Sequence, residues 1–297
     1  MTKPSASLLI ALAPAIFVVM WATGFIVARL SAPHAAPLYF LAIRFPIAGL
    51  IFAAIAFSVR APWPVPRAAA HATIAGALLH GGYLGPVYWA VAHGMPAGVS
   101  ALIIGLQPLI TAILASFIVN ERIGLRHWLG LAVGIAGVDL VVWPKLDFAA
   151  IGITPLTTAV NVAGAIAISL GTVYQKRFAA GLHLASGGAW QYVGASVVVL
   201  AAALMLEEFY FDGSPQVWLA LAWSVIVLSL GAISLLMLLI RAGEVSRVAG
   251  LIFLVPAVSA AMTYALFGET LTLVQIAGMA LCAAAVLIVM RKSARPA

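Results

Sequence analysis

Apolar runs of about 20 residues recur along the whole chain, and they constrain its fold more than any other feature. A helix of about 20 residues crosses the roughly 30 Å of hydrocarbon in a bilayer, and the alternating strands of a membrane barrel are absent. Hydrophobic residues make up 65% of the 297 residues and charged residues 8%, too little polar surface to cover a water-soluble globule. The sequence therefore predicts an all-α membrane protein. The ten predicted spans are residues 8–30, 38–59, 71–92, 97–119, 127–143, 155–175, 185–206, 217–240, 246–267 and 273–290.

Lys and Arg fall mostly on one side of the predicted membrane. Cytoplasmic loops hold these residues preferentially. Of the 15 basic residues, twelve lie near the two termini and in the second, fourth, sixth and eighth loops, while the opposite side holds Arg29 and Lys145. This distribution predicts cytoplasmic N- and C-termini. It also accounts for the net charge of +7, so the charge does not indicate nucleic-acid binding.

The segment 93–138 is repeated without a gap 148 residues downstream, at 241–286. The matches that are hardest to attribute to apolar composition are Pro108/Pro256, Glu121/Glu269 and Gly130/Gly278. We interpret the chain as two halves, residues 1–148 and 149–297, with five helices each. Because five is odd, equivalent helices cross the bilayer in opposite directions, as in the inverted repeats of secondary transporters. Duplication for stability alone is the less favoured alternative.

Several motifs resemble those of the EamA-type exporters of the drug/metabolite transporter superfamily. They are Trp21-Ala22-Thr23-Gly24-Phe25, Arg44-Phe45, Tyr88-Trp89-Ala90, Ser100-Ala101-Leu102-Ile103, Gln107-Pro108-Leu109, Ala112-Ile113-Leu114-Ala115 and Glu121-Arg122. The resemblance covers essentially the whole chain and is close to the YddG-like amino-acid exporters. It implies ten helices in two inverted halves and the export of metabolites, but it does not specify the cargo.

Polar and aromatic side chains deep in a span are costly unless they face a cavity or a partner. His80 lies near the middle of the third span, and Tyr83 follows on the same helical face. Gln107 lies at mid-depth in the fourth span, directly before Pro108, and Pro256 occupies the equivalent position in the ninth; both prolines are predicted to kink their helices. We expect His80, Tyr83 and Gln107 to line a cavity. A neutral histidine bonded to a neighbouring helix is the alternative for His80.

Other candidate cavity residues come from the first, sixth and seventh spans. They are Trp21, Thr23, Ser169, Thr172, Tyr174, Trp190 and Gln191. Gln191 enters because an offset of 147 pairs it with Arg44, whereas Trp190, near a helix end, fits an interfacial anchor better. Arg44 has three interpretations: it snorkels outward, pairs with Asp139, or meets a substrate carboxylate. We favour the two structural ones.

No Walker-type phosphate loop, HExxH motif, nucleophile elbow or carboxylate pair occurs in the sequence, and Cys282 is its one cysteine. Enzymatic catalysis and ATP-driven transport are therefore disfavoured, and neither a cofactor nor a metal is expected. We predict a secondary transporter of a bacterial inner membrane that exports small metabolites, foremost neutral or aromatic amino acids, by alternating access through a midplane cavity. Its expected partners are that substrate and the lipid bilayer; the sequence does not specify the oligomeric state and is compatible with a monomer. The alternatives are a drug or other metabolite carrier, a passive channel and a non-transporting subunit.

No carboxylate is predicted to reach the middle of the membrane, where ion-coupled carriers usually place one. Of the eight acidic residues, seven lie in or beside loops and Asp139 lies about one turn from the outer boundary. Glu121 and Glu269 are expected to cap the helices that follow them. His80 is the one deep side chain that titrates near neutral pH. We therefore expect facilitated transport down the substrate gradient, with a proton relay through His80 as the alternative.

Overall fold

The computed structural model describes residues 4–95, 100, 103–143, 153–243, 245–267 and 271–290. Across these residues every regular element is a helix, and the loops hold one isolated antiparallel bridge between Ala35 and Phe211. The prediction of an all-helical protein with about ten helices is confirmed. Glu269, which was expected to cap a helix, and Lys145 lie outside the described residues.

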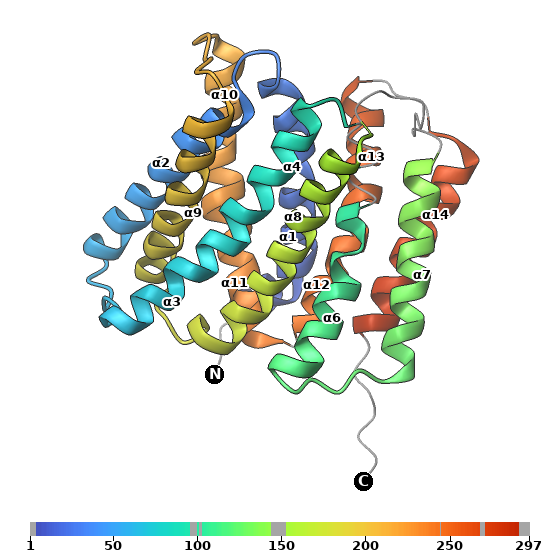
Figure 1. Ribbon diagram of the computed structural model, residues 1–297. Helices are drawn as coiled ribbons and strands as arrows, with labels where there is room; N and C mark the ends of the chain where they lie inside the picture. The colour runs from blue at the N-terminus through green and yellow to red at the C-terminus, as the bar shows by residue number, and fades with distance from the viewer. Residues whose placement is uncertain are drawn as a thin grey trace.

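The helices form successive rods, some of which contain a short turn of a different helix type (Figure 1). They are α1 (Pro4–Ser31), α2 (Pro37–Ser58), α3 (Pro66–Gly76) running through the π-helical turn Ala77–Gly81 into α4 (Gly82–Ala92), α6 (Gln107–Ile118), α7 (Leu125–Val142), α8 (Pro155–Tyr174) with the π-helical turn Gln175–Ala179, α9 (Leu184–Leu206), α10 (Pro215–Trp223) running through the π-helical turn Ser224–Ala232 into α11 (Ile233–Ala242), α12 (Val245–Gly250) running through the 3-10 turn Leu251–Phe253 into α13 (Leu254–Phe267), and α14 (Leu273–Met290).

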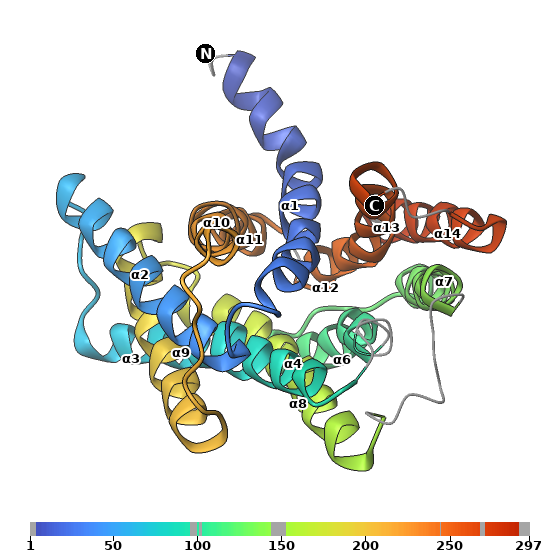
Figure 2. The same ribbon diagram turned by 90° about the horizontal axis from the view of Figure 1, so that it is seen from above.

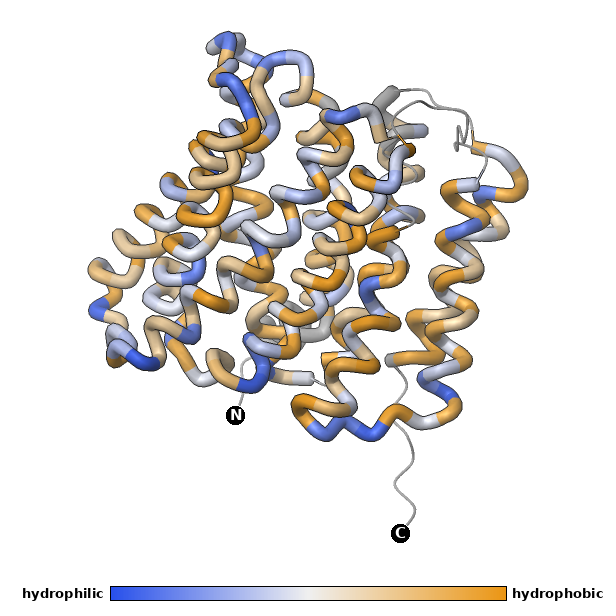
Figure 3. Tube along the Cα trace, in the orientation of Figure 1, coloured by the Kyte–Doolittle hydropathy of each residue, from blue (hydrophilic) through white to orange (hydrophobic). Residues whose placement is uncertain are grey.

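Length and composition suit these rods to a membrane. Five segments of the described chain are long and apolar enough to cross one: Pro37–Ser58, Leu125–Val142, Pro155–Ala179, Leu184–Leu206 and Pro215–Ala242. Shorter apolar helices cover Leu12–Ala28, Ile103–Ile118, Val248–Met262 and Leu273–Val289. Figure 3 shows hydrophobic residues along the helices and the most hydrophilic ones mainly at their ends and in the loops. The chain is therefore a multi-pass membrane protein.

Several helices begin at a proline, which has no backbone N–H to leave unpaired in the first turn. Pro37, Pro66, Pro155 and Pro215 each occupy this position. Thr154 adds a capping box at the start of α8, because its hydroxyl accepts from the Thr157 backbone while the Thr157 hydroxyl accepts from the Thr154 backbone. The helix boundaries therefore follow from local sequence.

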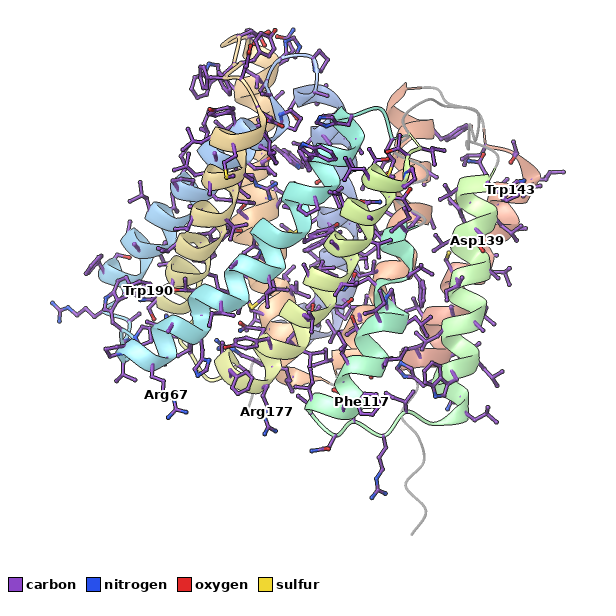
Figure 4. The ribbon with its side chains drawn as sticks, in the orientation of Figure 1. Arg67, Phe117, Asp139, Trp143, Arg177 and Trp190 are labelled. Atoms are coloured by element: carbon purple, nitrogen blue, oxygen red, sulfur yellow. The ribbon has the colours of Figure 1, made fainter. Side chains whose placement is uncertain are left out.

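The start of α1 and the end of α14 lie at one end of the bundle, which we call the inner end (Figure 1). Arg67 and Arg177 also project from the inner end (Figure 4). The opposite, outer end holds the loop between α9 and α10. Basic residues thus gather at the end where the first helix begins, which agrees with the charge distribution of the sequence.

The rods pack as pairs of helices from different halves of the chain. Figure 2, seen along the bundle, shows α7 beside α14 at one edge and α2 beside α9 at another, and both pairs are in close contact. Toward the centre, α4 packs on α8 and α1 on both α10 and α13. One buried core joins α1, α7, α8, α13 and α14, and a second joins α2, α9 and α10.

Close contact between α3 and α9 requires two glycines. A Cβ atom on Gly76 would overlap the backbone of Gln191, and one on Gly194 would overlap the carbonyl of Thr73. The two helices approach backbone to backbone because neither position carries a side chain. This contact holds Gln191 beside the π-helical turn Ala77–Gly81.

Gly194→Ala should therefore separate α3 from α9 and destabilise the protein by about 1–3 kcal/mol, as an overpacked core position does. The measurement is the thermal unfolding midpoint of the detergent-purified protein. Gly181→Ala is the matched control, since a Cβ there meets no atom within 4 Å. Equal midpoints for the two variants would show that the helices do not approach this closely.

Candidate functional site

A cavity of about 590 Å³ lies between α1, α2, α4, α9 and the α10–α11 rod. It extends from the π-helical turns that hold His80 and Leu228 to the outer ends of α1 and α4, at Ala32 and Ala92. Its polar and aromatic lining consists of Trp21, Ser31, Arg44, Phe45, His80, Tyr83, Tyr88, Ser100 and Tyr192. No carboxylate belongs to the part of the lining that the structure describes. This central cavity is the candidate substrate site.

Two π-helical turns border the central cavity. Ala77–Gly81 presents Leu79 and His80 to it, and Ser224–Ala232 presents Leu228. A π-helical turn widens the helix and occurs frequently at functional sites. The offset of 148 found for residues 93–138, extended back to this turn, carries His80 onto Leu228, and both residues lie in a π-helical turn.

His80 is 2% exposed and is held on two sides. Its ring stacks on Tyr192 at 4.9 Å between centroids with an interplanar angle of 4°. Its Nε2 lies 3.4 Å from Oε1 of Gln191, whose own Nε2 donates to Oε1 of Gln175 at 2.9 Å. Because the amide oxygen accepts, this chain assigns the proton of a neutral His80 to Nε2.

Arg44 is 5% exposed and lines the same cavity from α2. Its Nε donates to the Ser229 hydroxyl at 3.0 Å, and its guanidinium carbon lies 5.7 Å from the Phe45 ring centre. The proposed pairing with Asp139 is wrong, because Asp139 is exposed on α7, near its outer end and far from α2 (Figure 4). Arg44 does not snorkel outward either, since its side chain is buried beside the cavity.

Among the sequence-predicted site residues, Trp21, His80 and Tyr83 line the central cavity and Gln191 contacts it through His80. Thr23 points elsewhere: its hydroxyl donates to the Met20 carbonyl at 2.6 Å and accepts from the Trp223 indole at 2.9 Å. Trp190 lies on a separate groove between α3 and α9, with Pro66 and Ile74, at the side of the bundle (Figure 4).

Gln107 and the polar residues of α8 belong to the packed interior instead. Ser169 donates to the carbonyls of Ala165 and Gln107, and Thr172 donates to that of Ile168. The Gln107 side chain is buried, and its Oε1 accepts no hydrogen bond from a described residue. Backbone carbonyls satisfy the hydroxyls of Ser169 and Thr172, and neither these residues nor Gln107 lines the central cavity.

Tyr174 lies at the inner end of α8, where its hydroxyl is 2.7 Å from Nδ1 of His71. The helix of Pro108 is interrupted at Leu106, directly before α6 begins. The helix of Pro256 changes type at Leu251–Phe253. Both interruptions precede the proline by a few residues, where its missing N–H and its ring act on the backbone.

Sequence reasoning missed Phe45, Tyr88 and Tyr192, and it ranked Arg44 below its structural interpretations. The repeat offset of 147 carries a usable signal, because it pairs Arg44 with Gln191 and therefore Phe45 with Tyr192. Both members of the second pair line the cavity. Tyr88 stands in the motif that suggested the family, but its neighbours did not indicate which way it faces.

The outer rim of the central cavity is fixed by a clasp between the α1–α2 loop and the α9–α10 loop. The Ala36 N–H donates to the Tyr210 carbonyl, and the Asp212 N–H donates to the His34 carbonyl. The side chains of these two residues also bond, with His34 Nδ1 2.6 Å from Asp212 Oδ2. The Ser214 N–H and then His34 hold the pKa of Asp212 below its usual range. Burial raises the pKa of Glu207, whose carboxylate nevertheless accepts from the Leu38 N–H at the start of α2.

The inner end is closed where the α8 rod meets α11. Lys176 Nζ donates to the carbonyls of Ile240 at 2.8 Å, Arg241 at 3.3 Å and Gly243 at 2.9 Å, and the Arg241 guanidinium donates to the Leu182 carbonyl. A cation at the C-terminal end of a helix also complements its dipole.

Glu121 adds a second inner-end contact, accepting from Val245 and Ser246 at the start of α12. The expectation that Glu121 caps the helix after it is therefore corrected, since it caps α12 of the other half and not α7. The reason is spatial: α6 packs against α12, so the carboxylate just after α6 reaches the unpaired N–H groups at the start of α12.

A cavity whose described lining reaches the outer ends of α1 and α4, at Ala32 and Ala92, predicts a one-sided pattern of thiol reactivity. With Cys282 replaced by alanine, Ala28→Cys and Val87→Cys should react with a membrane-impermeant maleimide added outside right-side-out vesicles, because both positions line the central cavity. Ala195→Cys is the control, since Ala195 is fully buried between helices. Labelling of the cavity cysteines only from inside inverted vesicles would contradict the outward opening.

Comparison with known proteins gives relatives of similar length. A probable amino-acid metabolite efflux pump of Salmonella typhimurium is 26% identical over 91% of both chains. An uncharacterised transporter of Bacillus subtilis, YvbV, is 27% identical over 95% of this chain and 92% of its own. An uncharacterised inner membrane transporter of Escherichia coli, YedA, is 24% identical over 91% of this chain and 87% of its own. These relatives are transporters and not enzymes.

The fold and the family agree with these relatives. One crystal structure superposes with a TM-score of 0.77 over 95% of this chain and 96% of that chain, at 20% identity, which is a likeness of fold alone. The model of the EamA-like transporter family matches twice, at residues 6–143 and 157–291. The chain therefore belongs to the EamA-like transporter family.

Proposed function

We propose that the chain exports small metabolites, foremost amino acids, across a bacterial inner membrane by alternating access through the central cavity. The observation that carries this proposal is the cavity itself, which reaches mid-depth from the outer end while Lys176 bridges the inner end. A carrier in its outward-facing state has this arrangement. The names of the relatives support the cargo class and the membrane.

We further propose that the two halves, residues 1–148 and 149–297, are inverted repeats with both termini in the cytoplasm. The twofold match of the family model supports this division. Helix packing supports it too: α2 on α9, and α7 on α14, pair each helix with its own repeat equivalent, and α4 on α8 has its counterpart in α1 on α11. The paired π-helical turns at Ala77–Gly81 and Ser224–Ala232 fit the same relation.

If the two halves are inverted repeats, the gap between helices at the outer end has an equivalent gap, between the corresponding helices, at the inner end. At the outer end the cavity separates α1 from α4, where Ala28 and Val87 both line it. The repeat offsets carry this gap to the junction of the α8 rod with α11, which Lys176 closes. Exchanging the two states would close the outer gap and open the inner one around an unchanged central site.

Facilitated transport remains our proposal for energetics, because the described lining of the cavity contains no carboxylate that could carry an ion. Purified protein in liposomes should therefore take up labelled phenylalanine until it equilibrates, without a pH or sodium gradient. Uptake should saturate, and preloaded unlabelled substrate should accelerate it by counterflow. Protein-free liposomes are the control.

Other outcomes distinguish the alternatives. Uptake without saturation or counterflow would indicate a passive channel, and counterflow restricted to cationic drugs would indicate a drug carrier. Concentrative uptake that needs a pH gradient and disappears in His80→Ala would replace facilitated transport by the proton relay.

Lys176→Met should weaken the inner closure, because the charge-assisted hydrogen bonds to the end of α11 disappear. In the Cys282→Ala background, Leu235→Cys marks the inner counterpart of Val87. Its labelling from inverted vesicles should rise on the order of tenfold, since hydrogen bonds to a charged group contribute about 1.5–3 kcal/mol. Arg177→Met is the matched control, as Arg177 is exposed at the same end (Figure 4). Equal labelling in both variants would exclude Lys176 as a closure residue.

A further inference from the structure

We infer that Arg44 binds the carboxylate group of the transported molecule, and that the site selects monocarboxylates with an apolar or aromatic body without requiring an ammonium group. The inference rests on the proposed function only in taking the central cavity as the substrate site. It assigns a role to a buried charge that packing leaves unexplained.

The guanidinium of Arg44 is buried without a counter-charge. It is 5% exposed and makes one hydrogen bond, from Nε to the Ser229 hydroxyl at 3.0 Å. Within the described chain, its two terminal nitrogens bond to no acceptor and no carboxylate forms an ion pair with it. An uncompensated charge at this depth is costly, and because Arg44 lines the cavity, an anionic ligand there would compensate it.

The second half of the chain shows that the scaffold does not need this charge. Gln191 is the repeat equivalent of Arg44, and each side chain bonds to a π-helical turn of the other half: Arg44 to Ser229, and Gln191 to His80. A neutral amide therefore makes the equivalent bond between halves. The positive charge is the difference between the two positions, and it is present on the cavity wall.

Guanidinium geometry selects the chemistry of the ligand. The two terminal nitrogens form a planar fork that matches the two oxygens of a carboxylate. Aromatic rings line the same cavity from four helices: Trp21 on α1, Phe45 on α2, Tyr83 and Tyr88 on α4, and Tyr192 on α9. These rings provide apolar surface for the remainder of the ligand.

The described lining of the cavity offers an ammonium group no carboxylate as a counter-charge. No aspartate or glutamate belongs to the described cavity lining, and His80 offers only a neutral or cationic ring. The net charge of the lining is therefore positive, which a monocarboxylate anion compensates and a zwitterion does not. The two ligand types differ in one group, so a matched series of compounds separates them.

The test measures binding by isothermal titration to the detergent-purified full chain at neutral pH, with three probes that share a phenyl ring. We expect 3-phenylpropionate, which has only the carboxylate, to bind at least as tightly as phenylalanine, which has both groups. We expect 2-phenylethylamine, which has only the ammonium, to bind about 10- to 100-fold more weakly, the cost of losing a hydrogen bond to a charged group. Equal binding of the amine and the carboxylate would overturn the inference, as would failure of both carboxylates to bind.

Arg44→Gln supplies the matched variant, because it reproduces the residue of the other half and can still donate to Ser229. It should lose about 10- to 100-fold in affinity for 3-phenylpropionate. Arg44→Lys, which keeps the charge but not the fork, should lose less, and Arg67→Gln, at the exposed inner end, should lose nothing. Unchanged affinity in a folded Arg44→Gln would overturn the inference; if that variant does not fold, Arg44→Lys and the three probes on the native chain decide.

The carboxylate site and the proposed transport function can be refuted independently of each other. Arg44-dependent binding of carboxylates without counterflow in liposomes would refute the proposed function and leave the carboxylate site standing. Saturable counterflow at equal rates in the native chain and Arg44→Gln would refute the carboxylate site and leave the transporter standing.

Discussion

The absence of water from the hydrocarbon interior is the constraint on which the structure depends. Every polar group placed there needs a partner within the protein or a cavity to face. Ser169 and Thr172 return their hydroxyls to carbonyls one turn earlier on α8, and Ser100 and Asn161 bond to each other across helices. Arg44, His80, Tyr83 and Tyr88 line one central cavity instead.

The two halves provide similar scaffolds with different chemistry. Phe45 and Tyr192 occupy equivalent positions and both line the cavity, which preserves an aromatic wall on either side. His80 corresponds to Leu228, and Arg44 corresponds to Gln191, so one half contributes the charged and titratable groups and the other contributes neutral ones. Duplication accounts for the arrangement of the helices, and divergence between the two copies accounts for the side chains that are available to bind a ligand.

Charged side chains at the inner end join separate helices; they do not cap the helix that adjoins them in the sequence. Glu121 reaches the start of α12 in the other half, and Lys176 reaches the last carbonyls of α11. A helix end exposes several unpaired backbone groups, and any charged side chain of the right sign nearby can pair with them. Proximity in the fold, and not position along the chain, decides which helix end each charged side chain caps.

The sequence alone determined the all-helical membrane class, about ten helices and the family, because span length, hydropathy and motif spacing are local properties. It also indicated Trp21, His80 and Tyr83 as cavity residues from their depth. Only the tertiary structure separated them from Thr23 and Gln107, and only it brought Arg44 to the cavity. A membrane helix is apolar around much of its circumference, so periodicity does not mark the cavity face. A π-helical turn also inserts a residue and rotates the following face by about 100°, a shift that sequence periodicity does not register.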